Sequence, residues 1–168
     1  MDKTLFANMI VDSCESTNDI ARELARCGCP HGTWIAARTQ TVGRGRYGRR
    51  WVSGPGNLFL SVIVDCGAEP AREGLPLLAA RAVAGAISVF VPGAALKIKP
   101  PNDIYLDDAK LAGILCETAP SMGTCAVVGV GVNCMTAPDG LDVKTACLGV
   151  MPEMVLGSVK FGIICMRY

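Results

Sequence analysis

The segment Gly43–Trp51 constrains the fold of this chain most, because its composition requires a loop. Its sequence, Gly-Arg-Gly-Arg-Tyr-Gly-Arg-Arg-Trp, contains three glycines, four arginines and two aromatic residues, and no acidic residue. Glycines allow backbone N–H groups to approach a ligand closely. Arginines offer planar, permanently charged groups that suit phosphate and carboxylate oxygens. We therefore predict a loop that closes over a phosphate-bearing ligand; the alternative is a solvated basic loop, since runs of charge are often only surface.

The glycine spacing also matches the G-x-G-x-x-G motif of dinucleotide-binding proteins, which must follow a strand and open a helix. Residues 49–56 hold two glycines and a proline, so a helix cannot begin there. The glycine-rich loop of protein kinases does not fit either. Arg50 stands where that motif needs a valine, and neither His-Arg-Asp nor Asp-Phe-Gly follows in the sequence.

The positive charge is concentrated around this loop. The chain has 168 residues, a length typical of one domain, and a net charge of +1. Residues 38–50 contain five arginines and no aspartate or glutamate. A local positive potential on a nearly neutral protein favours a small anionic ligand over a long polyanion such as DNA.

Apolar residues make up 51% of the chain, so a membrane-spanning segment has to be considered. Residues 75–96 are the best candidate, but Pro76, Arg81 and Pro92 interrupt them, so we predict a buried helix and a turn, and no membrane span. The N-terminus lacks the charged-then-apolar layout of a signal peptide.

The nine cysteines are scattered along the sequence without a C-x-x-C pair, and His31 is the single histidine. This pattern indicates a reducing compartment, which we take to be the cytoplasm, and no fixed metal site. Most of the cysteines stand beside aliphatic residues, where a free thiol behaves as a small buried apolar group.

Near the N-terminus, residues 5–14 predict a strand, and a helix follows from Ser16. Ser16 and Asp19 have the spacing of a capping box, residues 20–25 provide an apolar face, and Gly28 ends the helix. Residues at such a cap can also present hydroxyl and amide groups, together with helix N–H donors, to a ligand.

Apolar runs of strand length predict the rest of a sheet. The predicted strands are residues 34–39, 57–64, 96–99, 104–106, 111–117 and 126–134. The first two would hold the arginine-rich loop at both ends, and in the last strand Gly129 and Gly131 leave room for a group to approach the sheet.

One long helix is expected at residues 75–90. Met151–Glu153 could begin another helix, whereas residues 160–168 look more like a strand or an unpacked end because glycines interrupt the pattern. Strands outnumber helices, so the predicted fold class is α/β (α+β), a mixed sheet flanked by helices.

Four segments, in this order, resemble the motifs of biotin protein ligases. Gly43–Trp51 resembles their adenylate-binding loop, and Ser16–Asn18 their early Ser-Thr-Asn motif. Lys99–Tyr105 with Lys110–Leu115 resembles the Lys-Trp-Pro-Asn-Asp stretch and the Lys-Leu-Ala-Gly-Ile-Leu strand beyond it. Gly129–Asn133 resembles the late Gly-x-Gly-x-Asn motif. The fold implied is the biotin–lipoate ligase catalytic domain, which is similar to class II aminoacyl-tRNA synthetases.

The resemblance implies an enzyme that joins biotin and ATP into biotinyl-AMP and then transfers biotin to a lysine of a biotin carboxyl carrier protein or carrier domain. Magnesium would be held mainly by the nucleotide. Arg46 and Lys99 are the expected catalytic residues. The residues implied for biotin are Ser16, Thr17, Asn18, Gln40, Gly43, Arg44 and Gly113. Those implied for the nucleotide are Arg44, Gly45, Arg46, Tyr47, Gly48, Arg49, Trp51, Asn102 and Asn133. Dimerisation by sheet extension, common in the family, is a further expectation.

The resemblance is clear over residues 13–133, and residues 134–168 diverge. Pro100 stands where the family usually has tryptophan. We expect residues 1–168 to be one catalytic domain, with neither the DNA-binding domain nor the small C-terminal barrel of some relatives. The alternatives are a lipoate ligase or octanoyltransferase, a shortened homologue that only binds biotin, and an RNA binder. The aromatic content of 5% argues against the last of these.

Overall fold

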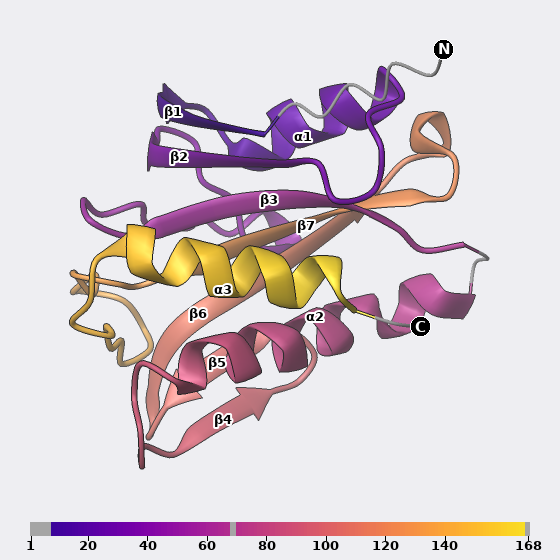
Figure 1. The fold of residues 1–168 in the computed structure, drawn as a ribbon. Helices are drawn as coiled ribbons and strands as arrows, with labels where there is room; N and C mark the ends of the chain where they lie inside the picture. Colours follow the sequence, from indigo (N-terminus) through magenta and orange to yellow (C-terminus); the bar gives the residue numbers. More distant parts are fainter. Residues whose placement is uncertain (1–7, 68–69, 167–168) are drawn as a thin grey trace.

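The computed structural model describes residues 8–67 and 70–166, which form one mixed sheet with helices on both faces (Figure 1). The strands are β1 (Met9–Cys14), β2 (Trp34–Gln40), β3 (Leu58–Asp65), β4 (Leu96–Lys99), β5 (Asp103–Leu106), β6 (Ala109–Thr118) and β7 (Cys125–Val132). The helices are α1 (Thr17–Arg26), α2 (Pro70–Ser88) and α3 (Pro152–Ile164). None of the helices in these residues is long and apolar enough to span a membrane.

The sheet has the order β1-β2-β3-β7-β6-β5-β4. Only β1 and β2 run parallel, joined through α1, and the other neighbours are antiparallel. A short turn suffices between antiparallel strands, whereas the parallel pair needs a crossover. The predicted mixed sheet is confirmed, and β3 is buried on both faces as its continuous apolar character predicted.

Alternation along β3 separates two cores on opposite faces of the sheet. Leu60 and Val62 belong to the larger core, under α2 and α3, and Ile63 belongs to the smaller core, under α1. Figure 1 shows α2 and α3 together across one face. Ser61 alternates with Leu60 and Val62 and therefore faces the α1 side, where it contacts residues of α1.

The end of the chain differs from the sequence prediction. Residues 160–164 are not a strand or an unpacked end but the last part of α3, whose Val155, Val159 and Ile163 are fully buried. A Cβ atom on Gly162 would lie 3.1 Å from the carbonyl oxygen of Ala82, so this glycine allows α3 to pack closely on α2. The glycine that suggested an interruption therefore serves helix packing. Residues 167–168 of that prediction lie outside the described residues.

The N-terminal prediction is tested only in part and needs a correction at the helix cap. Described structure begins at residue 8, so the first part of the predicted strand 5–14 lies outside it, and β1 starts at Met9. Ser16 is the N-cap of α1, but its side chain makes no capping hydrogen bond. The capping box is therefore not formed, because Asp19 turns to Arg44 instead.

The prediction that most of the cysteines behave as small buried apolar groups was only partly correct. Only Cys66 and Cys134 are buried, whereas Cys27 and Cys165 are exposed and the other five are intermediate. Aliphatic sequence neighbours did not ensure burial: the two exposed cysteines, Cys27 and Cys165, stand at the C-terminal ends of α1 and α3.

Candidate functional site

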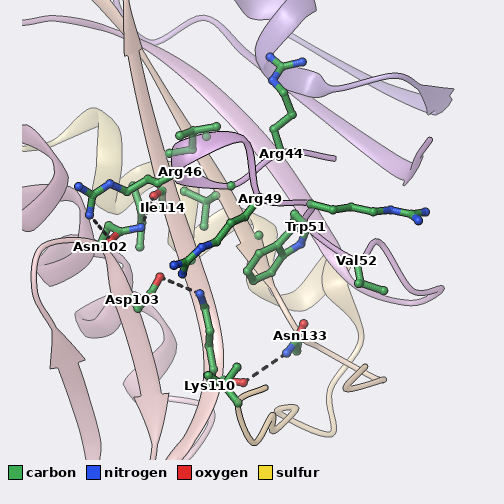
Figure 2. Close-up of a pocket in the computed structure, with 18 of the residues that line it drawn as sticks. Arg44, Arg46, Arg49, Trp51, Val52, Asn102, Asp103, Lys110, Ile114 and Asn133 are labelled. Atoms are coloured by element: carbon green, nitrogen blue, oxygen red, sulfur yellow. Dashed lines mark hydrogen bonds and ion pairs between the residues drawn. The ribbon is translucent and has the colours of Figure 1, made fainter. Parts of the chain in front are cut away.

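A cavity of about 590 Å³ lies on the α1 side of the sheet, under the arginine-rich loop. Its walls come from the start of α1, the loop after β2, the hairpin strands β5 and β6, and β7. Figure 2 shows cationic side chains from the loop and from β6 at one end of this cavity. Segments far apart in the sequence therefore meet at one site.

The cavity wall at the start of α1 carries polar, uncharged side chains. The backbone N–H and the hydroxyl group of Thr17 both donate to Gln40 Oε1, at 2.9 and 3.2 Å. The buried Ser61 hydroxyl lies 2.7 Å from Thr17 Oγ1 and 2.5 Å from Asn18 Oδ1. The first N–H groups of a helix have no partner within the helix, and Gln40 accepts a hydrogen bond from one of them, that of Thr17. This network holds Thr17, Asn18 and Gln40 in fixed positions on the cavity wall.

Gly129 on β7 is required by this network. A Cβ atom there would overlap with Asn18 Oδ1, and even Asn18 Cγ would lie only 2.8 Å away. Asn18 is itself held from the other side, because its Nδ2 donates to Glu117 Oε2 at 2.6 Å. The space predicted above Gly129 is therefore occupied by a buried side chain of the protein.

Trp51 covers the middle of the sheet inside the cavity. Cβ atoms on Gly131 and Gly113 would lie 2.5 and 2.9 Å from its ring, so both positions must remain glycine for the indole to lie flat there. Its Nε1 is buried and has no hydrogen-bond partner among the described residues. A buried donor without an acceptor is costly, so this N–H marks a point where a ligand acceptor would be favourable.

The opposite end of the cavity is cationic. Arg46 donates from Nη1 to Asn102 Oδ1 at 3.0 Å and from Nη2 to the Tyr47 hydroxyl at 2.7 Å. Asn102 in turn donates to the carbonyl of Ile114 at 2.9 Å, which ties the loop to β6. No salt bridge to a carboxylate joins Arg46, Arg49 or Lys99 within the described part of the chain. Unpaired cations that converge on a cavity suit phosphate oxygens.

Lys110 is a site residue that the sequence reasoning did not assign. It is the second residue of β6, its side chain is 22% exposed, and its Nζ lies 2.9 Å from Asp103 Oδ1 and 5.5 Å from the centroid of the Trp51 ring. Figure 2 shows Lys110 and Arg49 extending toward the same part of the cavity. Lys99 also lines the cavity but is exposed, 5.7 Å from the Tyr105 ring. The available signal was a single cation just before the apolar run of residues 111–116.

Arg44 behaves differently from the other arginines of the loop. Its two terminal nitrogens bind the two carboxylate oxygens of Asp19 at 2.7 and 2.8 Å, and Nη2 lies 3.6 Å from Glu117 Oε2. In Figure 2 its guanidinium group points away from those of Arg46 and Arg49. In this conformation Arg44 lines the cavity with a charge that is already paired.

The predicted site residues are brought together with two exceptions. Those that line the cavity are Ser16, Thr17, Asn18, Gln40, Arg44, Gly45, Arg46, Tyr47, Arg49, Trp51, Lys99, Asn102, Gly113 and Asn133. Gly43 and Gly48 do not line it. Gly43 is buried under the backbone of Trp51, and Gly48 makes a turn at φ +72°.

A second wall was not predicted at all. Pro138, Leu141, Val143 and Thr145 line the cavity from the segment after β7. This segment is attached by Thr145, which bridges to Lys110, and by Asn133, whose Nδ2 donates to the carbonyl of Ala146 at 3.0 Å. Asn133 therefore orders the wall as well as lining the site. No regular periodicity marks this segment, so sequence patterns had no means of placing it.

The ionisation of Asp19 reflects its contact with the loop. Hydrogen bonding from Arg44 is the main cause that holds the pKa of Asp19 below its ordinary value, with a smaller opposing contribution from burial. A lowered folded-state pKa means that the carboxylate stabilises the folded state above the ordinary pKa of aspartate, and that this contribution is lost as the pH falls through the lowered value.

We expect Asp19→Asn to reduce the loss of stability between pH 5 and pH 2 relative to the unchanged chain. The side chain is 38% exposed, so solvent screening limits the difference to less than about 1 kcal/mol. Urea unfolding at several pH values measures it. An equal acid dependence in both proteins would contradict this role of Asp19.

The residues around the cavity do not form a metal site of their own among the described residues. In the part of the chain that the structure describes, no three or more histidine, cysteine, aspartate or glutamate side chains are grouped to hold a metal ion. Most charged groups around the cationic end are guanidinium and ammonium groups, which repel a bare cation, and the Asp103 carboxylate there is paired with Lys110. A divalent ion fits this end only when an anionic ligand brings it.

A mixed sheet that carries a cavity with a polar wall and a cationic end suits the binding of a small molecule together with an anion. The sequence profile of the biotin/lipoate A/B protein ligase family matches residues 10–133. The chain belongs to this family.

Known relatives agree with this result. The chain is 43% identical over 129 residues to the biotin–[acetyl-CoA-carboxylase] ligase of Paracoccus denitrificans, a match that covers 74% of this chain and 53% of that protein. The chain thus spans about half the length of this relative. The biotin protein ligase of Leishmania major, solved with biotinyl-5-AMP, superposes with a TM-score of 0.83 at 26% identity, covering 95% of this chain and 74% of that one. The Aquifex aeolicus enzyme, solved with biotin and ATP, gives 0.75 at 27% identity, covering 94% and 69%. The predicted family and fold are confirmed.

Proposed function

We propose that this chain activates biotin with ATP and transfers it to a lysine of a biotin carboxyl carrier protein or carrier domain. In the first step a biotin carboxylate oxygen attacks the α-phosphorus of ATP, and pyrophosphate leaves. In the second step the lysine amine attacks the acyl carbon of biotinyl-AMP, loses a proton, and AMP leaves. The observation that carries this proposal is the two-ended cavity, polar at α1 and cationic under the loop.

The polar end matches the cyclic urea of biotin. Thr17, Asn18 and Gln40 offer hydroxyl and amide groups that can both donate and accept, as a urea carbonyl with two N–H groups requires. The Ser16 side chain makes no capping bond, which leaves its hydroxyl for the ligand. A lipoyl head group has no such polar atoms, so this wall favours biotin over lipoate.

The cationic end matches the reacting phosphate. Negative charge builds on phosphate oxygens as pyrophosphate leaves, and fixed cations aimed there lower the barrier. We assign this work to Arg46 and Arg49 from the loop and to Lys110 from β6, with Lys99 at the exposed rim. ATP would bring Mg²⁺, which neutralises triphosphate oxygens when bound. The loop would also keep water away from the activated intermediate.

Labelled biotin, ATP, Mg²⁺ and a carrier domain test the proposal. We expect labelled carrier to accumulate with the unchanged chain, and adenylate formation to fall about 100-fold in Lys110→Met, which keeps an unbranched side chain of similar length and removes its charge. Lys97→Met is the matched control, because Lys97 also pairs with a hairpin aspartate, Asp108, at 3.4 Å but lies outside the cavity.

Three results would contradict the proposal. One is the absence of both adenylate and labelled carrier with the unchanged chain, and a second is a preference for lipoate over biotin under the same conditions. Equal losses in Lys110→Met and Lys97→Met would remove the assigned role from Lys110.

Dimerisation through a sheet edge, at β1 or β4, stays a prediction that sedimentation can test.

A further inference from the structure

A cluster of four charged side chains adjoins the cavity, which one of them, Arg44, also lines, and none of the four has a role in the chemistry described above. Asp19 of α1 and Glu117 of β6 both face Arg44 of the loop. Arg22, one turn along α1, lies 3.5 Å from Asp19 Oδ1 and 3.7 Å from Glu117 Oε1. Two carboxylates and two guanidinium groups thus alternate across three separate elements.

The cluster reaches the neck of the arginine-rich loop. Arg44 forms an antiparallel bridge with Arg50, and Gly45 N donates to the carbonyl of Arg49 at 2.7 Å. Residues 44–50 are therefore a small hairpin whose neck contains Arg44 and whose tip carries Arg46. The neck is held to the body of the protein by a bidentate ion pair, the geometry in which an arginine is most firmly oriented.

The same cluster reaches the polar end of the cavity. Glu117 accepts from Asn18 Nδ2 at 2.6 Å as well as facing Arg44. Asp19 follows Asn18 directly on α1 and binds the loop instead of capping its own helix. One pair of carboxylates therefore ties the loop to the residues that form the opposite end of the site.

Global stability does not explain this arrangement. All four side chains are partly exposed, and ion pairs of that kind contribute little to folding. These ion pairs affect the position of the loop more than the stability of the fold, because a loop flanked by glycines has many alternative conformations to lose. A small misplacement of a catalytic group has a large effect on rate.

We propose that Asp19 and Glu117 are positioning residues, which hold the neck of the loop through Arg44 so that Arg46 and Arg49 face the reacting phosphate. This inference rests on the proposed function for its effect on rate. It separates one arginine of the loop that serves as an anchor, Arg44, from two that act on the ligand, Arg46 and Arg49. Arg44 serves as the anchor because both of its terminal nitrogens bind the Asp19 carboxylate, which fixes the neck of the loop to α1.

Limited digestion with trypsin tests the anchor without any enzyme activity. Trypsin cleaves after arginine, so the loop carries its own cleavage sites. We expect Asp19→Asn to raise the rate of cleavage within residues 44–50 about tenfold, since the neck opens more often. Asp12→Asn is the matched control, because it breaks the exposed Arg38–Asp12 pair of 2.7 Å, away from the loop. Unchanged cleavage of the loop in Asp19→Asn would overturn the proposal.

Steady-state kinetics test the effect on the site. In Asp19→Asn and Glu117→Gln we expect kcat/KM for ATP in adenylate formation to fall about tenfold, with Asp12→Asn unaffected. Arg44→Gln should reproduce the loss, and adding Asp19→Asn to it should cause little further change, as for residues that act through one contact. Increased loop cleavage with unchanged kinetics would overturn the positioning role. If the unchanged chain forms no adenylate, the proposed function fails, and the digestion still decides whether the anchor exists.

Discussion

Arg46→Ala is expected to reduce the formation of biotinyl-AMP by two or more orders of magnitude. Arg46 lines the cavity, is oriented by Asn102 and Tyr47, and has no carboxylate partner among the described residues. A fixed cation of this kind contributes about 3 kcal/mol to the transition state, which corresponds to a factor of more than 100 in rate. Pyrophosphate release in single-turnover experiments with saturating biotin measures the effect directly.

The control for this prediction is Arg38→Ala. Arg38 lies on β2, is exposed, and pairs with Asp12 at 2.7 Å outside the cavity. We expect wild-type rates and a nearly unchanged melting temperature in this variant, because exposed ion pairs contribute little. Comparable rates in Arg46→Ala and in the unchanged chain would remove Arg46 from its assigned role, and equal losses in the two variants would indicate a general effect of positive charge.

Gly129→Ala is expected to destabilise the fold by about 2–6 kcal/mol and to abolish biotin binding. The added methyl group would overlap with Asn18 Oδ1, and Asn18 is buried in a network with Ser61 and Glu117. Displacing it combines overpacking with the loss of buried hydrogen bonds, each worth about 1–3 kcal/mol. Urea unfolding and titration calorimetry with biotin measure the two effects.

Gly85→Ala is the matched control. Gly85 lies within α2, and a Cβ atom there would meet nothing within 4 Å. Alanine is the better helix former, so this variant should be more stable by about 0.5–1 kcal/mol and should bind biotin normally. Normal biotin binding by Gly129→Ala would show that Asn18 is not part of the binding wall.

The positions of most elements were predictable from local patterns. Continuous apolar character gave β3 and β7, alternation gave β4, and the loop between β2 and β3 followed from its glycines. The tail was not predictable in this way, because Gly162 weakens the helical pattern while allowing α3 to pack against Ala82 of α2. Its helical state depends on a surface that the local sequence does not contain.

The functional site also combines features that local sequence patterns predict with features that they do not. The sequence by itself determined where the arginines, the Ser-Thr-Asn turn and the glycines stand along the chain, because residue type and spacing are local properties. Only the tertiary structure decided that Arg44 is paired, that Lys110 points into the cavity, and that Trp51 lies on Gly131. Asn18 and Glu117 are 99 residues apart yet in contact. Such contacts arise from how strands and helices pack together, which no local pattern specifies.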